Sequence, residues 1–176
     1  MKKISLVLFY LLILGCSGTG VKLSFEDEKS NAIRAHYQNY LNNDMDGLKS
    51  LWSPDLKVYL NSTESISLEE LEVLLQAQHA TFSPIKMSWG TEGETDLGQW
   101  VETASYPPGP SNEPFTVTQT WFNWIATSKL TGETIKLPAH ISFIWGTDGK
   151  ISAEYHMYDT TEMIAAIEAS AKASAE

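Results

Sequence analysis

Three side chains near the end of the chain have the types and the spacing for proton-transfer chemistry. Glu154, His156 and Tyr158 alternate along Ile151–Tyr158, a segment whose residue pattern predicts a β-strand. Because side chains two residues apart on a strand point to the same face, the carboxylate, the imidazole and the phenol should lie together. The carboxylate can tune the imidazole as a base, with Tyr158 as the proton donor. The same groups also suit a satisfied polar cluster that lines a ligand pocket or a closed core.

Other kinds of catalytic or metal-binding chemistry find little support in the residue pattern. The four histidines are His36, His79, His140 and His156, and they include no close-set pair of metal ligands. No Gly-x-Ser-x-Gly motif occurs, so the sequence carries no local sign of a serine nucleophile. We therefore expect neither a metal site nor a cofactor.

Composition and charge limit the class of protein. The chain has 176 residues, is 43% hydrophobic and carries a net charge of −10. That apolar content is too high for a disordered chain, and the length suits one domain. The acidic charge argues against nucleic acid as a partner, because phosphate binding requires clustered Lys and Arg.

The N-terminus has the pattern of an export signal. Lys2 and Lys3 precede an apolar run, residues 4–14, that is too short to span a bilayer core of about 30 Å. The run ends in Gly15 and Cys16, which resembles the bacterial lipobox, in which the cysteine at the cleavage site is lipidated. A buried cysteine beside an ordinary signal peptide is the alternative.

This interpretation divides the chain into three parts. Residues 1–15 are predicted to form a lipoprotein signal peptide, residues 16–27 the lipidated Cys16 and a flexible tether, and residues 28–171 a single domain. The protein would then be exported and held on a bacterial membrane only through its lipid anchor. Ser17 follows the cysteine where an aspartate would favour inner-membrane retention, so we expect the outer membrane.

Helices come first along the mature chain, and strands follow. Helical spacing of apolar residues predicts helices over Phe25–Asn42, Gly47–Trp52 and Ser67–Phe82, with a last helix over Thr161–Ala171. Alternation predicts strands over Leu56–Leu60, Ile85–Trp89, Gln99–Tyr106, Phe115–Lys129, Glu133–Trp145 and Ile151–Tyr158. Pro138 should introduce a bulge or bend in its strand. This order favours an α+β fold in which one curved antiparallel sheet wraps around the helices.

Two stretches resemble the nuclear transport factor 2-like superfamily, which includes ketosteroid isomerases and SnoaL-like polyketide cyclases. They are residues 35–55, which contain Ala-His-Tyr-Gln-Asn-Tyr-Leu and Leu-Trp-Ser-Pro-Asp, and residues 148–159, which begin Asp-Gly-Lys-Ile. The resemblance implies a cone-shaped domain with a pocket inside the cone. It says little about function, because this scaffold serves many roles.

The catalytic residues of the isomerases are not carried over with this resemblance. The position of their first-helix tyrosine falls on His36, and that of the proton-shuttling acid falls on Leu60 or Asn61. The position of the second acid, which the isomerases keep neutral, falls on Ile141. Two of the three positions therefore lack an ionisable group, which argues against steroid isomerase chemistry.

The same resemblance, with strand alternation, predicts which side chains face the pocket. On the two central strands the predicted inward residues are Phe115, Val117, Gln119, Trp121, Ile141 and Phe143. The predicted ligand pocket consists of His36, Trp121, Phe143, Glu154, His156 and Tyr158. Phe122 and Trp124 would then lie on the outer face of the sheet, as the apolar surface of a homodimer.

Two functions of different class follow from this sequence. The first is a membrane-tethered binding domain that holds a small apolar or aromatic ligand in the cone pocket without catalysis. The second is a SnoaL-like lyase, isomerase or cyclase that uses the His156–Glu154 pair.

Overall fold

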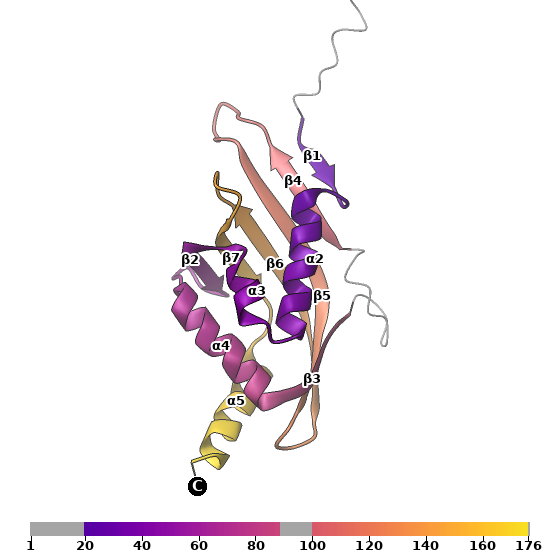
Figure 1. Ribbon diagram of the computed structural model, residues 1–176, viewed down its shortest axis with the longest axis vertical. Coiled ribbons are helices and arrows are strands. Elements are labelled where there is room, and N and C mark those ends of the chain that lie inside the picture. Colours follow the sequence, from indigo (N-terminus) through magenta and orange to yellow (C-terminus); the bar gives the residue numbers. More distant parts are fainter. Residues whose placement is uncertain (1–19, 89–99, 176) are drawn as a thin grey trace, which may run out of the picture.

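Helices lie over one face of a curved sheet in the computed structural model, which describes residues 20–88 and 100–175 (Figure 1). The helices are α2 (Glu28–Leu41), α3 (Met45–Lys49), α4 (Leu68–Thr81) and α5 (Thr161–Ala173). The strands are β1 (Lys22–Ser24), β2 (Trp52–Leu60), β3 (Phe82–Ser88), β4 (Val101–Tyr106), β5 (Phe115–Ser128), β6 (Thr134–Trp145) and β7 (Ile151–Met157). The predicted α+β class is confirmed. The predicted signal peptide, Cys16, Trp89 and Gln99 lie outside the described residues.

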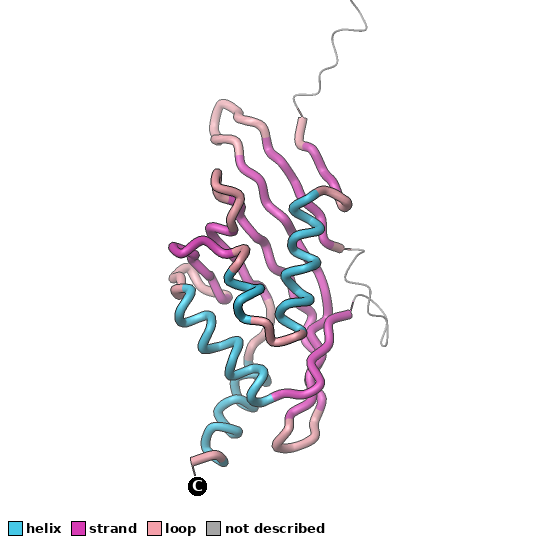
Figure 2. Tube along the Cα trace, viewed as in Figure 1, coloured by secondary structure: helices cyan, strands magenta, loops and turns pink. Residues whose placement is uncertain are grey.

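The sheet is built around its two longest strands, β5 and β6, which pair over most of their length. Its order is β1-β4-β5-β6-β7-β2, and β3 pairs with β5 beside this path. The first half of β5 pairs with β4 and the second half with β3, so two short strands share one edge of a long strand. The tube trace shows these long strands bending along their length behind the helices (Figure 2).

Three details differ from the sequence prediction. β2 pairs with β7 in parallel, although every other strand pair is antiparallel within the described residues. Lys22–Ser24, which we placed in the tether, pair with β4 as strand β1. Of the bulge or bend predicted at Pro138, the bulge is absent, because this residue pairs with Asn123 in an unbroken ladder.

The ends of the helices follow from local side-chain chemistry. The Asp27 carboxylate accepts hydrogen bonds from the backbone N–H groups of Lys29 and Ser30 and so caps α2. Ser67 and Glu70 form a capping box at the start of α4. The start of α5 has no such box: its N-cap is Thr160, which makes no capping hydrogen bond, and the neighbouring Asp159 accepts from the N–H of Thr161.

The inward face of β5 is the reverse of the one we predicted. Thr120 pairs with Ile141, which pairs with His156, so these three residues share the concave face. Phe122 and Trp124 lie on that face and are buried, whereas Trp121 pairs with His140 on the convex face. The predicted direction of Phe115, Val117 and Gln119 is wrong for the same reason, and the Phe115 side chain is 41% exposed. Ile141 and Phe143 point inward as predicted.

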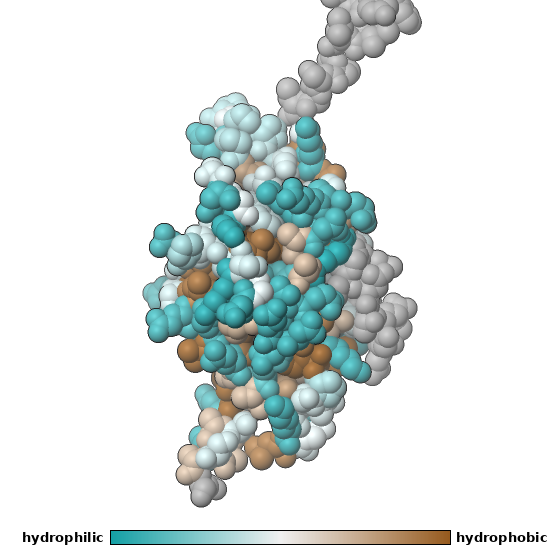
Figure 3. Space-filling view, in the orientation of Figure 1, coloured by the Kyte–Doolittle hydropathy of each residue, from teal (hydrophilic) through white to brown (hydrophobic). Residues whose placement is uncertain are grey.

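The reversal of β5 also changes the surface expected to form a dimer. Phe122 and Trp124 are inside the cone and cannot contribute to an interface. The convex face instead carries Tyr155 and Met157, which are 38% and 56% exposed. The face seen in Figure 3 is mostly hydrophilic, with scattered hydrophobic residues between the polar ones. The homodimer remains a prediction.

Within the described residues, the helices are all too short or too polar to cross a membrane.

The capping box of α4 gives a stability test of the fold. Replacing Ser67 with Ala removes the side chain that accepts from the N–H of Glu70. We expect the free energy of unfolding to fall by about 1 kcal/mol, the usual effect of losing an N-cap. Urea denaturation followed by circular dichroism measures the change. Ser111→Ala, in an exposed loop, is the control, and equal stability of the two variants would contradict the capping role.

Candidate functional site

The concave face of the sheet and the helices over it enclose a cavity of about 70 Å³. Its walls come from all four helices on one side and from β2, β3, β5, β6 and β7 on the other. Most of the wall is aromatic or aliphatic, and the polar groups cluster where β7 ends. A single water needs about 10–15 Å³ of such space, so the cavity has room for a molecule of a few heavy atoms.

A buried carboxylate and imidazole form the polar part of the wall. His156 Nε2 lies 2.8 Å from Glu154 Oε2, and Trp52 Nε1 donates to Glu154 Oε1 over 2.6 Å. A carboxylate only accepts, so His156 must carry its proton on Nε2. Both residues are buried, with Glu154 only 2% exposed. The arrangement orients the imidazole and leaves its second nitrogen, Nδ1, free to act as a base.

The environment of Glu154 favours its charged form. Burial by itself would raise the pKa of this carboxyl group. The hydrogen bond from His156, the positive charge that the two nearby imidazoles carry when protonated and the hydrogen bond from Trp52 outweigh burial and hold the pKa below its usual value. The cavity wall therefore contains a carboxylate at neutral pH.

Tyr158 lies next to the free nitrogen of His156. The phenol oxygen is 3.5 Å from His156 Nδ1, a distance at the limit of a hydrogen bond. Burial and the charge of Glu154 raise the pKa of Tyr158 to about 12, so it stays protonated. The Asn61 side chain holds the backbone of Tyr158 by accepting from its N–H and donating to its carbonyl group. Asn61 thus fixes the tyrosine, although it cannot serve as the acid that the isomerases have near this position.

His36 reaches the same cavity from α2. Its ring packs edge-on against Trp52, with centroids 5.0 Å apart, and against Phe143. Burial lowers the pKa of His36 to about 4; the charge of Glu154 opposes that shift without reversing it. This imidazole is therefore neutral at physiological pH, and its Nδ1 is buried without a hydrogen-bond partner.

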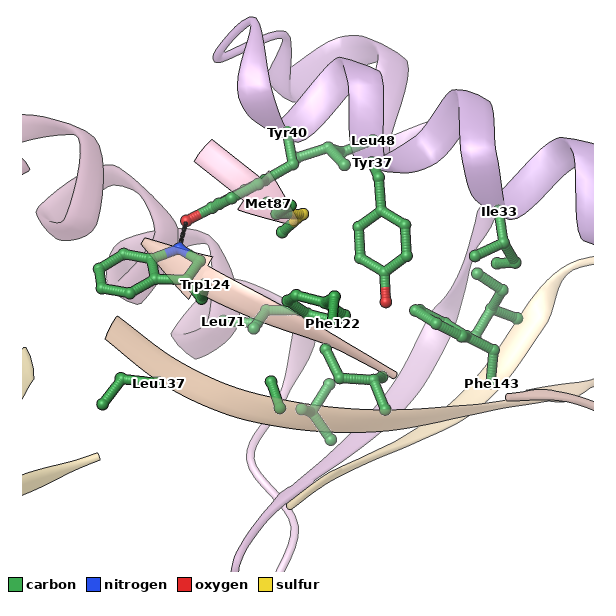
Figure 4. Close-up of a cluster of buried hydrophobic side chains, with 14 of the residues drawn as sticks. Ile33, Tyr37, Tyr40, Leu48, Leu71, Met87, Phe122, Trp124, Leu137 and Phe143 are labelled. Atoms are coloured by element: carbon green, nitrogen blue, oxygen red, sulfur yellow. Dashed lines mark hydrogen bonds between the residues drawn. The ribbon is translucent and has the colours of Figure 1, made fainter. Parts of the chain in front are cut away.

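Three further hydrogen bonds hold the aromatic wall in place. Trp124 Nε1 donates to the Tyr40 hydroxyl over 2.9 Å (Figure 4). That hydroxyl donates to Gln78 Oε1 over 2.6 Å. The Tyr37 hydroxyl lies 2.6 Å from Thr120 Oγ1 on β5. Each buried hydroxyl has a partner, so these rings are fixed parts of the wall.

The structure brings together four of the six predicted pocket residues. His36, Glu154, His156 and Tyr158 all line the cavity. Trp121 does not, because it lies on the convex face and stacks on His140. Phe143 points inward but packs behind His36 as part of the core.

Most of the aromatic wall is absent from the predicted pocket. Tyr37, Tyr40, Trp52, Phe122 and Trp124 all line the cavity. The one available sign in the sequence is the three-residue spacing of Tyr37 and Tyr40, which is typical of one face of a helix. No local pattern could connect Trp52 to a carboxylate that lies 102 residues away.

Among residues 20–88 and 100–175, no three His, Cys, Asp or Glu side chains converge as metal ligands would. The two imidazoles of the cavity share it with a single carboxylate, and that carboxylate already accepts two hydrogen bonds.

Comparison with known proteins identifies the fold. No protein-family profile matches the sequence, and no curated protein does either. Among solved structures, a nuclear transport factor 2-like protein from Exiguobacterium is similar to this chain, with a TM-score of 0.52 and 15% sequence identity. The match covers 73% of this chain and 98% of the Exiguobacterium chain. IdmH from Streptomyces antibioticus, described as a proposed polyketide cyclase, has a TM-score of 0.53 at 14% identity over 81% of this chain and 99% of its own.

A third solved structure has a ligand. It is a Catenulispora acidiphila protein with a ketosteroid isomerase-like fold, in complex with trimethylamine. Its TM-score is 0.50 at 9% identity, over 73% of this chain and 85% of its own. At these identities the comparisons establish the fold and not the activity: this chain has the nuclear transport factor 2-like fold.

The neutral state of His36 predicts a specific pH dependence of stability. Its pKa of about 4 lies below the value of about 6.5 in an unfolded chain, so the unfolded state binds the proton first as the pH falls. This contribution is fully present above about pH 6.5 and is lost as the pH falls towards 4. At pH 5 the loss should be about 2 kcal/mol relative to pH 7.

Urea unfolding of the native chain and of His36→Phe at both pH values measures this loss. Phe keeps an aromatic ring against Trp52 but cannot titrate, so its stability should fall less over the same range. An equal fall in the two proteins would show that His36 is not the group responsible.

Proposed function

We propose that the cone cavity binds a small, predominantly apolar molecule and that the His156–Glu154 pair moves a proton on it. The observation that carries this proposal is the buried contact of 2.8 Å between His156 Nε2 and Glu154 Oε2. It fixes the tautomer, leaves Nδ1 as the base, and stabilises the imidazolium that forms when the base takes up a proton. Structures of this fold described as polyketide cyclase or bound to trimethylamine are compatible with a small-molecule site.

The size and lining of the cavity limit the reaction. A space of about 70 Å³ accepts a few heavy atoms, so a larger substrate would place only a small group inside the cavity. A carbon acid of this size, such as a small ketone, would lose a proton from carbon to His156 Nδ1, and the electron pair would move onto its oxygen. Return of the proton to carbon completes an exchange or an isomerisation.

Hydrogen–deuterium exchange into acetone tests the proposed base. In D₂O the native chain should accelerate deuteration of the methyl groups, measured by proton NMR. His156→Ala should remove about two to four orders of magnitude of that acceleration, the usual contribution of a general base. His140→Ala is the matched control, because this histidine lies on the convex face and contacts the Thr120 carbonyl group. Unchanged exchange in His156→Ala would refute the role of the base.

Binding without catalysis is the second candidate, and one observation favours it. The Tyr158 hydroxyl lies beside His156 Nδ1. These two groups can form hydrogen bonds with a ligand without transferring a proton to it or from it. In that case His156→Ala would weaken ligand binding by about 1–2 kcal/mol, and the native chain would show no acceleration of exchange.

We also infer that the protein is an exported lipoprotein, on the basis of Cys16 and the apolar run before it. The folded domain begins by Lys22, where β1 pairs with β4, so a short segment would connect the lipid to the sheet. A homodimer formed through the convex face is part of the same proposal.

Metabolic labelling with radioactive palmitate tests the anchor. The native chain should incorporate label and sediment with membranes, whereas Cys16→Ala should do neither. Label that persists in Cys16→Ala would contradict the lipoprotein interpretation. Ser17→Ala, which keeps the cysteine, is the matched control.

A further inference from the structure

One acidic side chain lies on the cavity wall without a basic side chain to balance it. Glu154 is that acid, and no lysine or arginine of the described residues lines the cavity. The carboxylate accepts hydrogen bonds from Trp52 and His156 on its two oxygens, which favour its ionised form. Because His36 is neutral, the wall has a net negative charge whenever His156 is in the neutral form that the proposed base requires.

Aromatic side chains surround that charge. Besides the two imidazoles, six residues with rings line the cavity, namely Tyr37, Tyr40, Trp52, Phe122, Trp124 and Tyr158. They come from α2, from β2, from β5 and from the end of β7, so they enclose the space from several sides. Aromatic faces carry negative electrostatic potential and attract cations, most strongly where water is excluded.

We propose that the occupant of this cavity is a small organic cation, an alkylated ammonium group held by the aromatic rings opposite Glu154. This inference rests on the proposed binding function of the cavity and adds the charge of the ligand to it. An anion would be repelled by Glu154, and a neutral molecule such as a ketone would bind without the attraction that this charge gives a cation.

The hydrogen bonds of Glu154 favour an alkylated cation. Each oxygen of Glu154 already accepts a hydrogen bond, so the ligand does not need an N–H group to donate another. Methyl groups around a charged nitrogen present apolar surface to the apolar wall while keeping the charge. A group of five heavy atoms also matches the size of the cavity.

A bound cation would affect the proposed base. A cation beside the His156–Glu154 pair disfavours a second positive charge on His156, so it keeps the imidazole neutral and weakens it as a base. A protonated His156 and a bound cation would compete for the same carboxylate.

Two probes of nearly equal size separate charge from shape. Tetramethylammonium and tert-butanol each have five heavy atoms, and each gives a sharp methyl resonance that broadens on binding to the full chain in detergent. We expect tetramethylammonium to bind at least about tenfold more tightly than tert-butanol. Glu154→Gln should reduce this preference to about twofold or less.

Two further variants keep the test decisive. Glu102 on β4 lies opposite Gln119 of β5 and does not line the cavity. Glu102→Gln should therefore leave the preference for tetramethylammonium over tert-butanol unchanged. Phe122→Leu keeps the carboxylate but removes one ring, and should weaken tetramethylammonium binding about threefold while tert-butanol changes less. If Glu154→Gln fails to fold, Phe122→Leu decides.

The possible results distinguish this inference from the function on which it rests. Equal or tighter binding of tert-butanol to the native chain would overturn the cation and leave small-molecule binding intact. A preference that survives in Glu154→Gln, or a Phe122→Leu variant that weakens both probes equally, would also overturn it. Binding of neither probe would contradict the proposed function itself.

Discussion

Burying a carboxylate costs several kcal/mol unless hydrogen bonds or charges compensate it, and the interior of this cone is arranged around one such group. Glu154, on β7, accepts from Trp52 on β2 and from His156 two residues along its own strand. The parallel pairing of β2 with β7 makes this possible, because it brings the start of one strand and the middle of the other to one end of the cone. That charge fixes the tautomer of His156 and affects the pKa values of Tyr158 and His36.

The two halves of α2 have different roles with respect to the sheet. Near its start, Ser30 joins a buried chain of hydroxyl groups through Thr103 to Thr118, where Trp145 Nε1 donates its proton. Each of these hydroxyl groups has a partner. Near its end, His36, Tyr37 and Tyr40 turn towards a space that the protein does not fill, and one imidazole nitrogen has no partner. One helix thus closes one end of the cone and lines a cavity at the other.

Much of the architecture could be predicted from the sequence, because it depends on local signals. Ser67 and Glu70 identify the start of α4, and alternation along 151–158 correctly places Glu154 and His156 together inside the cone. Alternation failed on β5 because Trp121 and Phe122 are both large and aromatic, so hydrophobicity does not distinguish its faces. The pairing with Ile141 does distinguish them, and pairing is a long-range property. The contact between Trp52 and Glu154 escaped prediction for the same reason.

The protonation of His156 tests the account most directly. A long-range proton–nitrogen correlation spectrum of the full chain, labelled with ¹⁵N at histidine, shows which ring nitrogen carries the proton at neutral pH. The hydrogen bond to Glu154 predicts a proton on Nε2 and a bare Nδ1. A proton on Nδ1 with a bare Nε2 would contradict the arrangement around Glu154, and protons on both nitrogens would contradict the role of His156 as a base.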